Sequence, residues 1–301
     1  MRSFRFRAVG AILGLAVLAV ACGSGDGATD GDPIKVASFG FNESVIIAEI
    51  YAQGLEAEGY TVERHLNLGN REVVKPALES GEIDLVPEYI GTLAGFLEVE
   101  ASADSNATWE AAKAAFEELG VTLLAYGPAQ DKNAFVVTAE TASQHDLTTV
   151  SDLEPVADEL IFGGPPECPE RPLCLPGLQE VYGITFSEFT PLDDAGPITI
   201  AALEGGEIDV ALLFSTQGII AANGWLALED DQGLNPAENV VPAIRMDVVE
   251  AYGDELVALL ESYTAALTTE DLTELNKRAD LDQEDPALLA EEWLTDNGFL
   301  E

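Results

Sequence analysis

The chain has 301 residues, of which 55 are Asp or Glu and only 13 are Lys or Arg, giving a formal net charge of −42 at pH 7. A chain this acidic repels nucleic acid and other anionic polymers, which excludes them as partners. The length allows two domains with sizeable cores.

The N-terminus resembles an export signal. Its first seven residues contain three arginines, and an uncharged apolar run from Ala8 to Ala21 is too short to span a bilayer. The small residues before Cys22 resemble a bacterial lipoprotein cleavage site. We expect a signal peptide at 1–21, a lipidated Cys22, a flexible tether at 22–32, and anchoring to the outer face of the cell membrane. The alternative is an ordinary secretory signal, with Cys22 left unpaired.

Strands and helices alternate from residue 34 onward. We expect strands at 34–38, 60–66, 83–86 and 121–126, and helices at 42–59, 71–80, 88–97 and 108–119. This order of strand, helix and strand predicts a mostly parallel sheet.

A second series of elements begins at Ala134. We expect strands at 134–138, 160–163, 226–228 and 240–244, and helices at 175–182 and 217–223. Further helices are expected at 246–252, 254–267, 269–280 and 286–297. This helical tail has no strands of its own, so we expect it to pack back on the first lobe.

A short motif occurs twice, 125 residues apart. Ala77–Leu85 reads ALESGEIDL and Ala202–Val210 reads ALEGGEIDV, so seven of the nine positions are identical. Each copy is typical of a helix end, a glycine that ends the helix in the left-handed conformation, and a strand. Two such units indicate two comparable α/β lobes, although short turns of this kind also recur by chance.

The two series predict two α/β lobes with a ligand cleft between them. The chain is expected to leave the first lobe near 127–132 and return near 235–242, so that two crossings form a hinge. Lobe 1 would comprise 33–128 and 241–301, and lobe 2 would comprise 129–240. Ligands lie beyond the carboxyl ends of strands in such sheets. The segments to watch are 39–43, 87–92, 131–133, 214–217 and the loop that contains Arg171.

The remaining cysteines, Cys168 and Cys174, lie in a proline-rich loop. Outside the cytoplasm, two close cysteines are expected to form a disulfide. A metal site would need more ligands, and neither of the two histidines is near in sequence. The disulfide is expected to stiffen this loop.

Four segments together resemble a known family: 81–92 with its GEIDLVPEYIGT, 128–137, 171–178 and 211–216. They are similar to substrate-binding proteins of ABC importers, within the glycine betaine, carnitine and choline osmoprotectant binders of the ProX or OpuAC-like type. The resemblance implies a type II periplasmic-binding-protein-like fold whose two lobes close on the ligand. It also implies a membrane permease with its ATPase as partner, a monomer, and no cofactor.

In betaine-binding members of this family, aromatic rings surround the quaternary ammonium, and polar or cationic groups hold the carboxylate. By this resemblance Tyr89 matches the family tyrosine, and Thr92 matches a threonine on the carboxylate side. Arg171 matches the arginine of the second lobe, and Phe214 occupies a position for an aromatic residue. Further candidate contacts are Phe39, Asn133, Ser215 and Thr216.

The chain also departs from the family pattern. Phe39 replaces a frequent lysine, and Asn133 and Val86 replace aromatic residues. The aromatic cage is thus only partly present, and Phe39, Phe41 or Trp225 would have to complete it. The resemblance therefore leaves open which quaternary ammonium or other zwitterion is bound.

Simpler roles remain open for several of these residues. Tyr89 could pack at a helix start, Phe214 could belong to the core, and Arg171 could pair with an acidic neighbour in its own loop, Glu167 or Glu170. We expect Glu43 and Glu88 to be helix N-terminal charges that are favoured by the helix dipole rather than ligand groups.

Enzyme signatures are missing from the sequence. It contains no Gly-x-Ser-x-Gly, no phosphate-binding Walker loop and no dinucleotide fingerprint. We therefore expect a binding protein and not an enzyme. The alternatives are a binding protein for another small polar solute, such as an amino acid derivative, and a surface lipoprotein with no role in transport.

Overall fold

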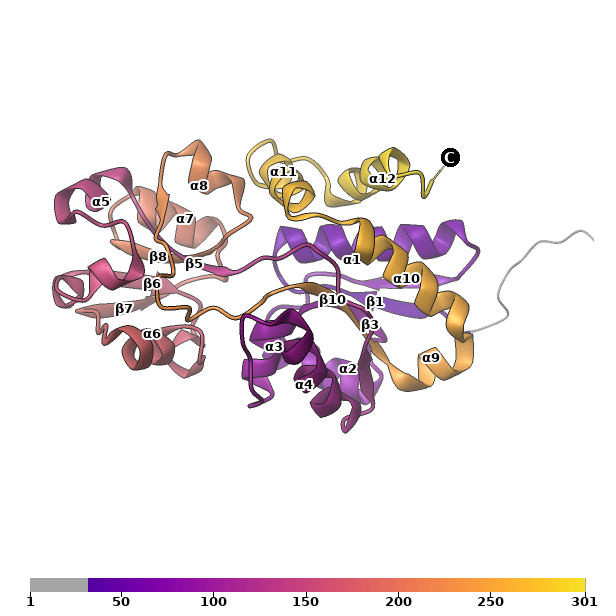
Figure 1. The fold of residues 1–301 in the computed structure, drawn as a ribbon. Coiled ribbons are helices and arrows are strands. Elements are labelled where there is room, and N and C mark those ends of the chain that lie inside the picture. The colour runs from indigo at the N-terminus through magenta and orange to yellow at the C-terminus, as the bar shows by residue number, and fades with distance from the viewer. Residues whose placement is uncertain (1–31, 301) are drawn as a thin grey trace, which may run out of the picture.

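The computed structural model describes residues 32–300, which form two lobes lying side by side (Figure 1). Each lobe is built on a five-stranded sheet. The two sheets and their covering helices confirm the predicted two-lobed α/β fold. The predicted signal peptide and the lipidated Cys22 lie outside the described residues.

The sheet of the first lobe has the strand order β2-β1-β3-β10-β4. Strand β1 is parallel to β2 and β3, whereas β10 is antiparallel to both β3 and β4. The elements are β1 (Ile34–Ala37), α1 (Asn42–Ala57), β2 (Val62–His65), α2 (Arg71–Ser80), β3 (Leu85–Tyr89), α3 (Ile90–Phe96), α4 (Ser105–Glu117), β4 (Val121–Leu123) and β10 (Val240–Arg245).

The sheet of the second lobe has the order β7-β6-β8-β5-β9, with β5 antiparallel to β8 and β9. Its elements are β5 (Asn133–Val137), α5 (Ala139–His145), β6 (Ile161–Gly164), α6 (Leu175–Tyr182), β7 (Glu188–Pro191), α7 (Pro197–Glu204), β8 (Val210–Phe214), α8 (Gly218–Ala222) and β9 (Leu226–Ala227). Short 3-10 helices are η1 (Val150–Leu153), η2 (Ala157–Glu159) and η3 (Cys168–Glu170). Alternate residues of β8 face two different cores: Val210 and Leu212 face one, and Ala211 and Leu213 face the other.

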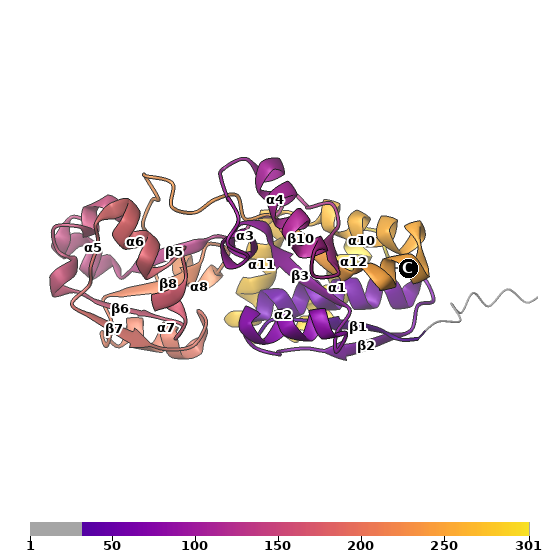
Figure 2. The ribbon, with the colours of Figure 1, turned by 90° about the horizontal axis from the view of Figure 1, so that it is seen from below.

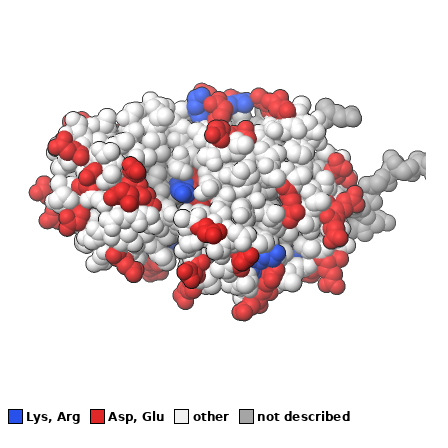
Figure 3. Space-filling view, viewed as in Figure 1, with Lys and Arg blue, Asp and Glu red and all other residues white. Residues whose placement is uncertain are grey.

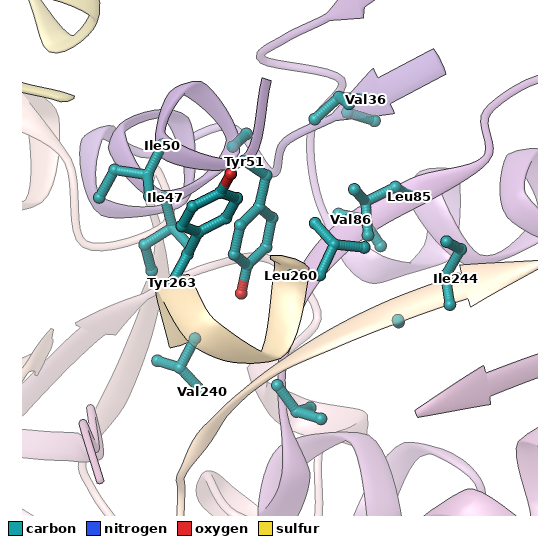
Figure 4. Packing of buried hydrophobic residues seen from close by; sticks show 14 of the residues in the cluster. Val36, Ile47, Ile50, Tyr51, Leu85, Val86, Val240, Ile244, Leu260 and Tyr263 are labelled. Carbon is teal, nitrogen blue, oxygen red and sulfur yellow. The ribbon is translucent and has the colours of Figure 1, made fainter. Parts of the chain in front are cut away.

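The helical tail consists of α9 (Met246–Tyr252), α10 (Asp254–Ala266), α11 (Thr269–Asp280) and α12 (Pro286–Asp296). As predicted, it packs on the first lobe, where its apolar residues join the core of the sheet (Figure 4). The Tyr51 hydroxyl of α1 lies 3.0 Å from the Thr264 hydroxyl of α10. A Cβ at Gly54 would lie within 2.6 Å of the Tyr263 ring, so only glycine allows α10 to lie this close to α1.

Some predicted elements were wrong in their limits. The helix expected from residue 88 begins at Ile90, because β3 continues to Tyr89, which pairs with Val240 of the antiparallel β10. Strand β7 and helix α5 were not predicted. Strand β7 lies at the sheet edge and is partly exposed, with no buried residue in its run, so it gives no hydrophobic alternation.

The repeated motif folds the same way in both lobes. Gly81 and Gly206 adopt the left-handed conformation, with φ of 78° and 70°. The Asp84 carboxylate then accepts the N–H of Lys35 at 2.9 Å, and the Asp209 carboxylate accepts the N–H of Ile161 at 2.8 Å. Each aspartate thereby fixes the start of the neighbouring parallel strand, β1 or β6.

Two extended segments, 127–131 and 235–239, join the lobes and run antiparallel to each other (Figure 1). The N–H of Val240 donates to the Ala129 carbonyl at 2.9 Å, and the N–H of Asp131 donates to the Glu238 carbonyl at 3.2 Å. The predicted lobe limits, at 128/129 and 240/241, stay predictions.

Seen from below, the two lobes again lie side by side, with α2 in the first lobe and α6 and α8 in the second (Figure 2). Acidic side chains are spread over the visible face of both lobes, and basic ones occur at a few places (Figure 3). Within residues 32–300, no helix combines the length and apolarity needed to cross a membrane.

Candidate functional site

A cavity of about 110 Å³ lies between the two lobes. It has room for on the order of ten water-sized groups, which suits a small solute. Residues from the first lobe, from the first crossing segment and from the second lobe all line it. A ligand in this cavity would therefore contact both halves of the molecule.

Four aromatic rings form one end of the cavity. Phe41 lies at their centre: its ring centroid is 6.0 Å from Phe39, 6.2 Å from Tyr89 and 5.1 Å from Phe214. All four rings line the cavity, and Phe214 comes from the second lobe. Aromatic faces grouped around a desolvated space attract an organic cation.

A buried hydrogen-bond network lies behind these rings and joins the lobes. The Tyr89 hydroxyl donates to Glu43 Oε1 at 2.7 Å, and the Thr216 hydroxyl donates to Glu43 Oε2 at 2.6 Å. The side-chain amide of Asn276 donates to the same Oε2 at 2.6 Å. Burial raises the pKa of Glu43, while these donors oppose the rise. Glu43 does lie in the first turn of α1, as expected, but it also connects the lobes.

Asp131, on the first crossing segment, extends this network. Its Oδ1 accepts the Ser215 hydroxyl at 3.1 Å and the Thr216 N–H at 3.1 Å. Burial, together with the charge of Glu43, holds the pKa of Asp131 well above its usual range. Ser215 and Thr216 therefore bind other residues of the protein, and neither is among the described residues that line the cavity.

The other end of the cavity is charged. Arg71, at the start of α2, is buried and forms an ion pair with Glu88 at 2.7 Å. Its Nη2 also donates to the Thr92 hydroxyl at 3.0 Å, and its guanidinium lies 5.4 Å from the Phe39 ring centroid. Glu88 therefore lies on β3 and is the ion-pair partner of the buried Arg71. Its predicted role as a helix N-terminal charge was wrong.

Arg171 reaches the same end from the second lobe. Its guanidinium lies 5.0 Å from the Phe96 ring centroid and pairs with Glu72 of the first lobe at 2.8 Å. Glu167, in its own loop, is 3.9 Å away. The Nε of Arg171 is buried without a hydrogen-bond partner among the described residues.

The loop that carries Arg171 is closed by the predicted disulfide between Cys168 and Cys174, whose Cα atoms are 5.3 Å apart. The side-chain amide of Asn133 donates to the Leu173 carbonyl at 2.9 Å and attaches this loop to β5. The side-chain amide of Asn70, in the first lobe, donates to Glu167 at 2.9 Å. The loop thus forms a wall of the cavity that bridges to the opposite lobe.

The sequence-based candidates fall into two groups. Six of them line the cavity: Phe39, Tyr89, Thr92, Asn133, Arg171 and Phe214. Ser215 and Thr216 lie behind its wall, and Trp225 packs against the core of the second lobe. Phe41 and Phe39, two of the three residues considered for completing the aromatic group, both belong to it.

Sequence reasoning missed Arg71, Phe96 and Asp194, which also line the cavity. Arg71 follows the loop after β2, so the rule that selected residues beyond strand ends would have found it. Asp194 follows β7, the strand that the sequence did not predict. Within residues 32–300, no group of three or more His, Cys, Asp or Glu side chains is arranged to hold a metal ion.

Comparison with known proteins gives consistent matches. The family model for the substrate-binding domain of ABC-type glycine betaine transport systems matches residues 32–296. The glycine betaine-binding protein YehZ of Escherichia coli is 28% identical over 283 residues, covering 89% of this chain and 91% of that protein. The carnitine transport binding protein OpuCC of Listeria monocytogenes is 30% identical over 283 residues, covering 92% and 91%.

Solved structures agree with these matches. The crystal structure of a glycine betaine/carnitine/choline ABC transporter protein has a TM-score of 0.68 and 27% identity, covering 89% of this chain and all of that one. Lactococcal OpuAC in its closed form with glycine betaine has a TM-score of 0.63 at 17% identity, covering 89% and 96%, which supports the fold.

Proposed function

This chain belongs to the family of substrate-binding domains of ABC-type glycine betaine transport systems, and from that membership we propose that it captures a quaternary-ammonium solute between its lobes and delivers it to an ABC importer. Members of the family are solute-binding proteins and not enzymes, in agreement with the sequence analysis. Proteins of this kind work outside the cytoplasm with a membrane permease and its ATPase.

The aromatic end of the cavity is the observation that supports a quaternary ammonium as the ligand. Phe39, Phe41, Tyr89 and Phe214 surround one desolvated space and come from both lobes. A methylated ammonium has a large, weakly hydrated surface, and its attraction to aromatic faces reaches about 2 kcal/mol or more when it is desolvated. An amino acid derivative would bring a primary ammonium, which needs hydrogen-bond acceptors that these rings do not offer.

The charged end is proposed to hold the polar group of the ligand. Thr92, Asn133 and Arg171 line the cavity, and the Arg171 guanidinium can donate to an oxygen atom of the ligand. Arg71 lies beside Thr92 and adds a second guanidinium from the opposite lobe. Ser215 and Thr216 are proposed to act through lobe closure rather than by ligand contact, because their partners are Asp131 and Glu43.

Binding of several solutes tests this proposal. Titration calorimetry should detect choline, glycine betaine or carnitine, and should detect no binding of 3,3-dimethylbutanol, which has the shape of choline without its charge. Phe41→Leu keeps apolar volume but removes the ring, so the affinity for the cation should fall about tenfold or more. Equal binding of the charged and uncharged compounds would reject a cation site, and tight binding of an amino acid alone would favour the alternative solute class.

Closure of the lobes is proposed to accompany binding. Ion pairs and hydrogen bonds join the lobes on both sides of the cavity, at Arg171 with Glu72 and at Thr216 with Glu43. A ligand that contacts both lobes shifts the equilibrium toward the closed form by its difference in affinity for the two forms. Small-angle scattering should show a smaller radius of gyration with saturating ligand, and an unchanged radius with a tight ligand would contradict closure.

We also propose that the protein is a monomer, held at the outer face of the cell membrane by a lipid on Cys22. The charged start, the apolar run and the small residues before the cysteine support this anchor. Metabolic labelling with a fatty-acid analogue should mark the wild type but not Cys22→Ser. Equal labelling of both proteins would contradict the anchor.

A further inference from the structure

The cavity contains a carboxylate that the proposed function does not use, that of Asp194. This residue lies in the turn between β7 and α7, is half-buried, and lines the charged end of the cavity. The turn is anchored next to it: the Asp193 carboxylate accepts the N–H of Ile198 at 3.0 Å and that of Thr199 at 2.8 Å. Ala195, on the other side, has a φ of 55°, so the backbone reverses sharply there.

The surroundings of Asp194 make it a titratable group with no fixed partner. Its carboxylate forms no hydrogen bond to the rest of residues 32–300. It lies within electrostatic range of Arg171 and Glu167 in the disulfide loop, of Arg71 in the first lobe, and of Asp193. Burial raises the pKa of Asp194 to about 6; Glu167 and Asp193 add to the rise, and the two arginines oppose it.

The two arginines at this end are already compensated in charge. Arg71 is paired with the buried Glu88, and Arg171 is paired with Glu72 and lies near Glu167. Two cations therefore face three carboxylates before Asp194 is counted. A ligand carboxylate placed here would meet the charge of Asp194, whereas a ligand hydroxyl could accept an N–H of the Arg171 guanidinium and bring no charge.

Resting on the proposed function, we propose that Asp194 selects the ligand by its net charge. Its carboxylate competes with a ligand carboxylate for Arg71 and Arg171, so the site prefers a quaternary-ammonium alcohol, of the chemical class of choline, over a zwitterionic quaternary-ammonium acid, of the class of betaine.

Competition of this kind links binding to protons. A zwitterion can share the arginines only when Asp194 is neutral, so its binding takes up a proton near neutral pH. A cation stabilises the ionised form of Asp194, so its binding takes up no proton and releases one from the fraction that is still protonated. The sign of the proton exchange therefore distinguishes the two ligand classes, and a purely structural role for Asp194 predicts no difference.

The first measurement needs no variant. Calorimetric titrations of the purified full-length protein with choline and with glycine betaine are carried out at pH 6.5 in two buffers of different ionisation enthalpy. We expect proton uptake with betaine, proton release or no exchange with choline, and a higher affinity for choline. From pH 6.5 to pH 5, the affinity for betaine should rise relative to that for choline.

The second measurement compares Asp194→Asn with Glu170→Gln, which removes an exposed acid from the same lobe outside the cavity. Asp194→Asn should raise the affinity for betaine about tenfold or more, lower that for choline, and abolish the opposite proton exchange. Glu170→Gln should leave the ratio of the two affinities within about twofold of wild type.

The outcomes separate this inference from the proposed function. If both ligands bind with the same proton exchange and Asp194→Asn leaves their affinity ratio unchanged, the role of Asp194 is overturned and the quaternary-ammonium site stands. If neither ligand binds wild type or variant, the proposed function fails, and the role of Asp194 fails with it.

Discussion

Each copy of the repeated motif leads into a strand that ends in an aromatic residue. Only the strand of the second copy is followed by a residue, Thr216, whose side chain binds the other lobe. Strand β3 ends at Tyr89 and β8 ends at Phe214, and both rings enter the cavity. Two residues further on, the N–H of Gly91 donates to Glu238 at 3.0 Å, and the N–H of Thr216 donates to Asp131 at 3.1 Å.

The two acids that accept these N–H groups occupy equivalent positions. Glu238 and Asp131 lie on the two crossing segments. Glu238 comes two residues before Val240, the strand partner of Tyr89, and Asp131 comes two residues before Asn133, the strand partner of Phe214. The two arrangements differ in their contact with the opposite lobe. Thr216 also donates to Glu43 of the first lobe, whereas Gly91 has no side chain to do so. The repeat thus places the rings, and departures from the repeat hold the lobes together.

The largest effect on stability is expected at the buried ion pair between Arg71 and Glu88, whose residues flank the first copy of the motif. Arg71→Ala leaves the Glu88 carboxylate buried without its charge partner, so the free energy of unfolding should fall by about 3–5 kcal/mol. Arg171→Ala is the matched control, because its partner Glu72 has a side chain that is 42% exposed. That change should cost about 1 kcal/mol or less in urea unfolding. Equal losses in the two variants would contradict this difference.

The buried acid beside the first copy should make stability depend on pH. Burial raises the pKa of Glu238 to about 8, and its Oε1 has no partner among the described residues. Between its unfolded pKa and about 8, the folded state binds more protons than the unfolded state, so this contribution to stability is lost as pH rises.

Glu238→Gln keeps an acceptor for Gly91 and removes the titration. The variant should be more stable than wild type at pH 9 by about 1–3 kcal/mol, with little difference at pH 4. Thermal unfolding across this range measures the effect, and Glu100→Gln, at an exposed position of the same lobe, serves as control. Parallel pH profiles for Glu238→Gln and wild type would refute the prediction.

The two aromatic strand ends should differ in what they contribute. Phe214 makes ring contacts with Phe41, so Phe214→Ala should weaken binding of a quaternary ammonium by about 1–2 kcal/mol, or tenfold or more. Tyr89→Phe keeps its ring but removes the hydrogen bond to Glu43, and should reduce stability more than affinity. Calorimetry measures the affinity of both variants, and urea unfolding measures their stability. A larger loss of affinity in Tyr89→Phe than in Phe214→Ala would contradict the prediction.

The smallest effect concerns the aspartates of the repeat. Asp84→Ala and Asp209→Ala each remove one hydrogen bond to the start of a neighbouring strand, which should cost about 1 kcal/mol. Asp84 also lies 3.7 Å from Arg245, so its loss should cost slightly more. A loss confined to one of the two variants would show that the repeat is not equivalent in the two lobes.

Local patterns predicted much of this fold, because apolar periodicity and helix-ending glycines mark most elements without reference to the rest of the chain. The continuous apolar run of β8 and the repeat around Gly81 and Gly206 are of this kind. The helix limit at Ile90 was missed because a partner strand about 150 residues away extends β3.

The site was harder to predict than the fold. The family pattern selected Tyr89, Phe214 and Arg171, which line the cavity. The pairing of Arg71 with Glu88 and the approach of Asp194 to both arginines depend on how distant segments meet, and no short motif records such contacts. The ligand roles of these residues stay predictions.

The acidic surface of the two lobes bears on the speed of capture as well as on selectivity. A formal charge of −42 surrounds the molecule with a negative potential that attracts cations and exerts little net force on a zwitterion at long range. The association rate constant of a cationic ligand should therefore exceed that of a zwitterion and fall as added salt screens the potential. A cationic ligand should therefore reach the cleft fastest at low ionic strength. At high ionic strength cations and zwitterions should associate at similar rates, whatever their affinities at equilibrium.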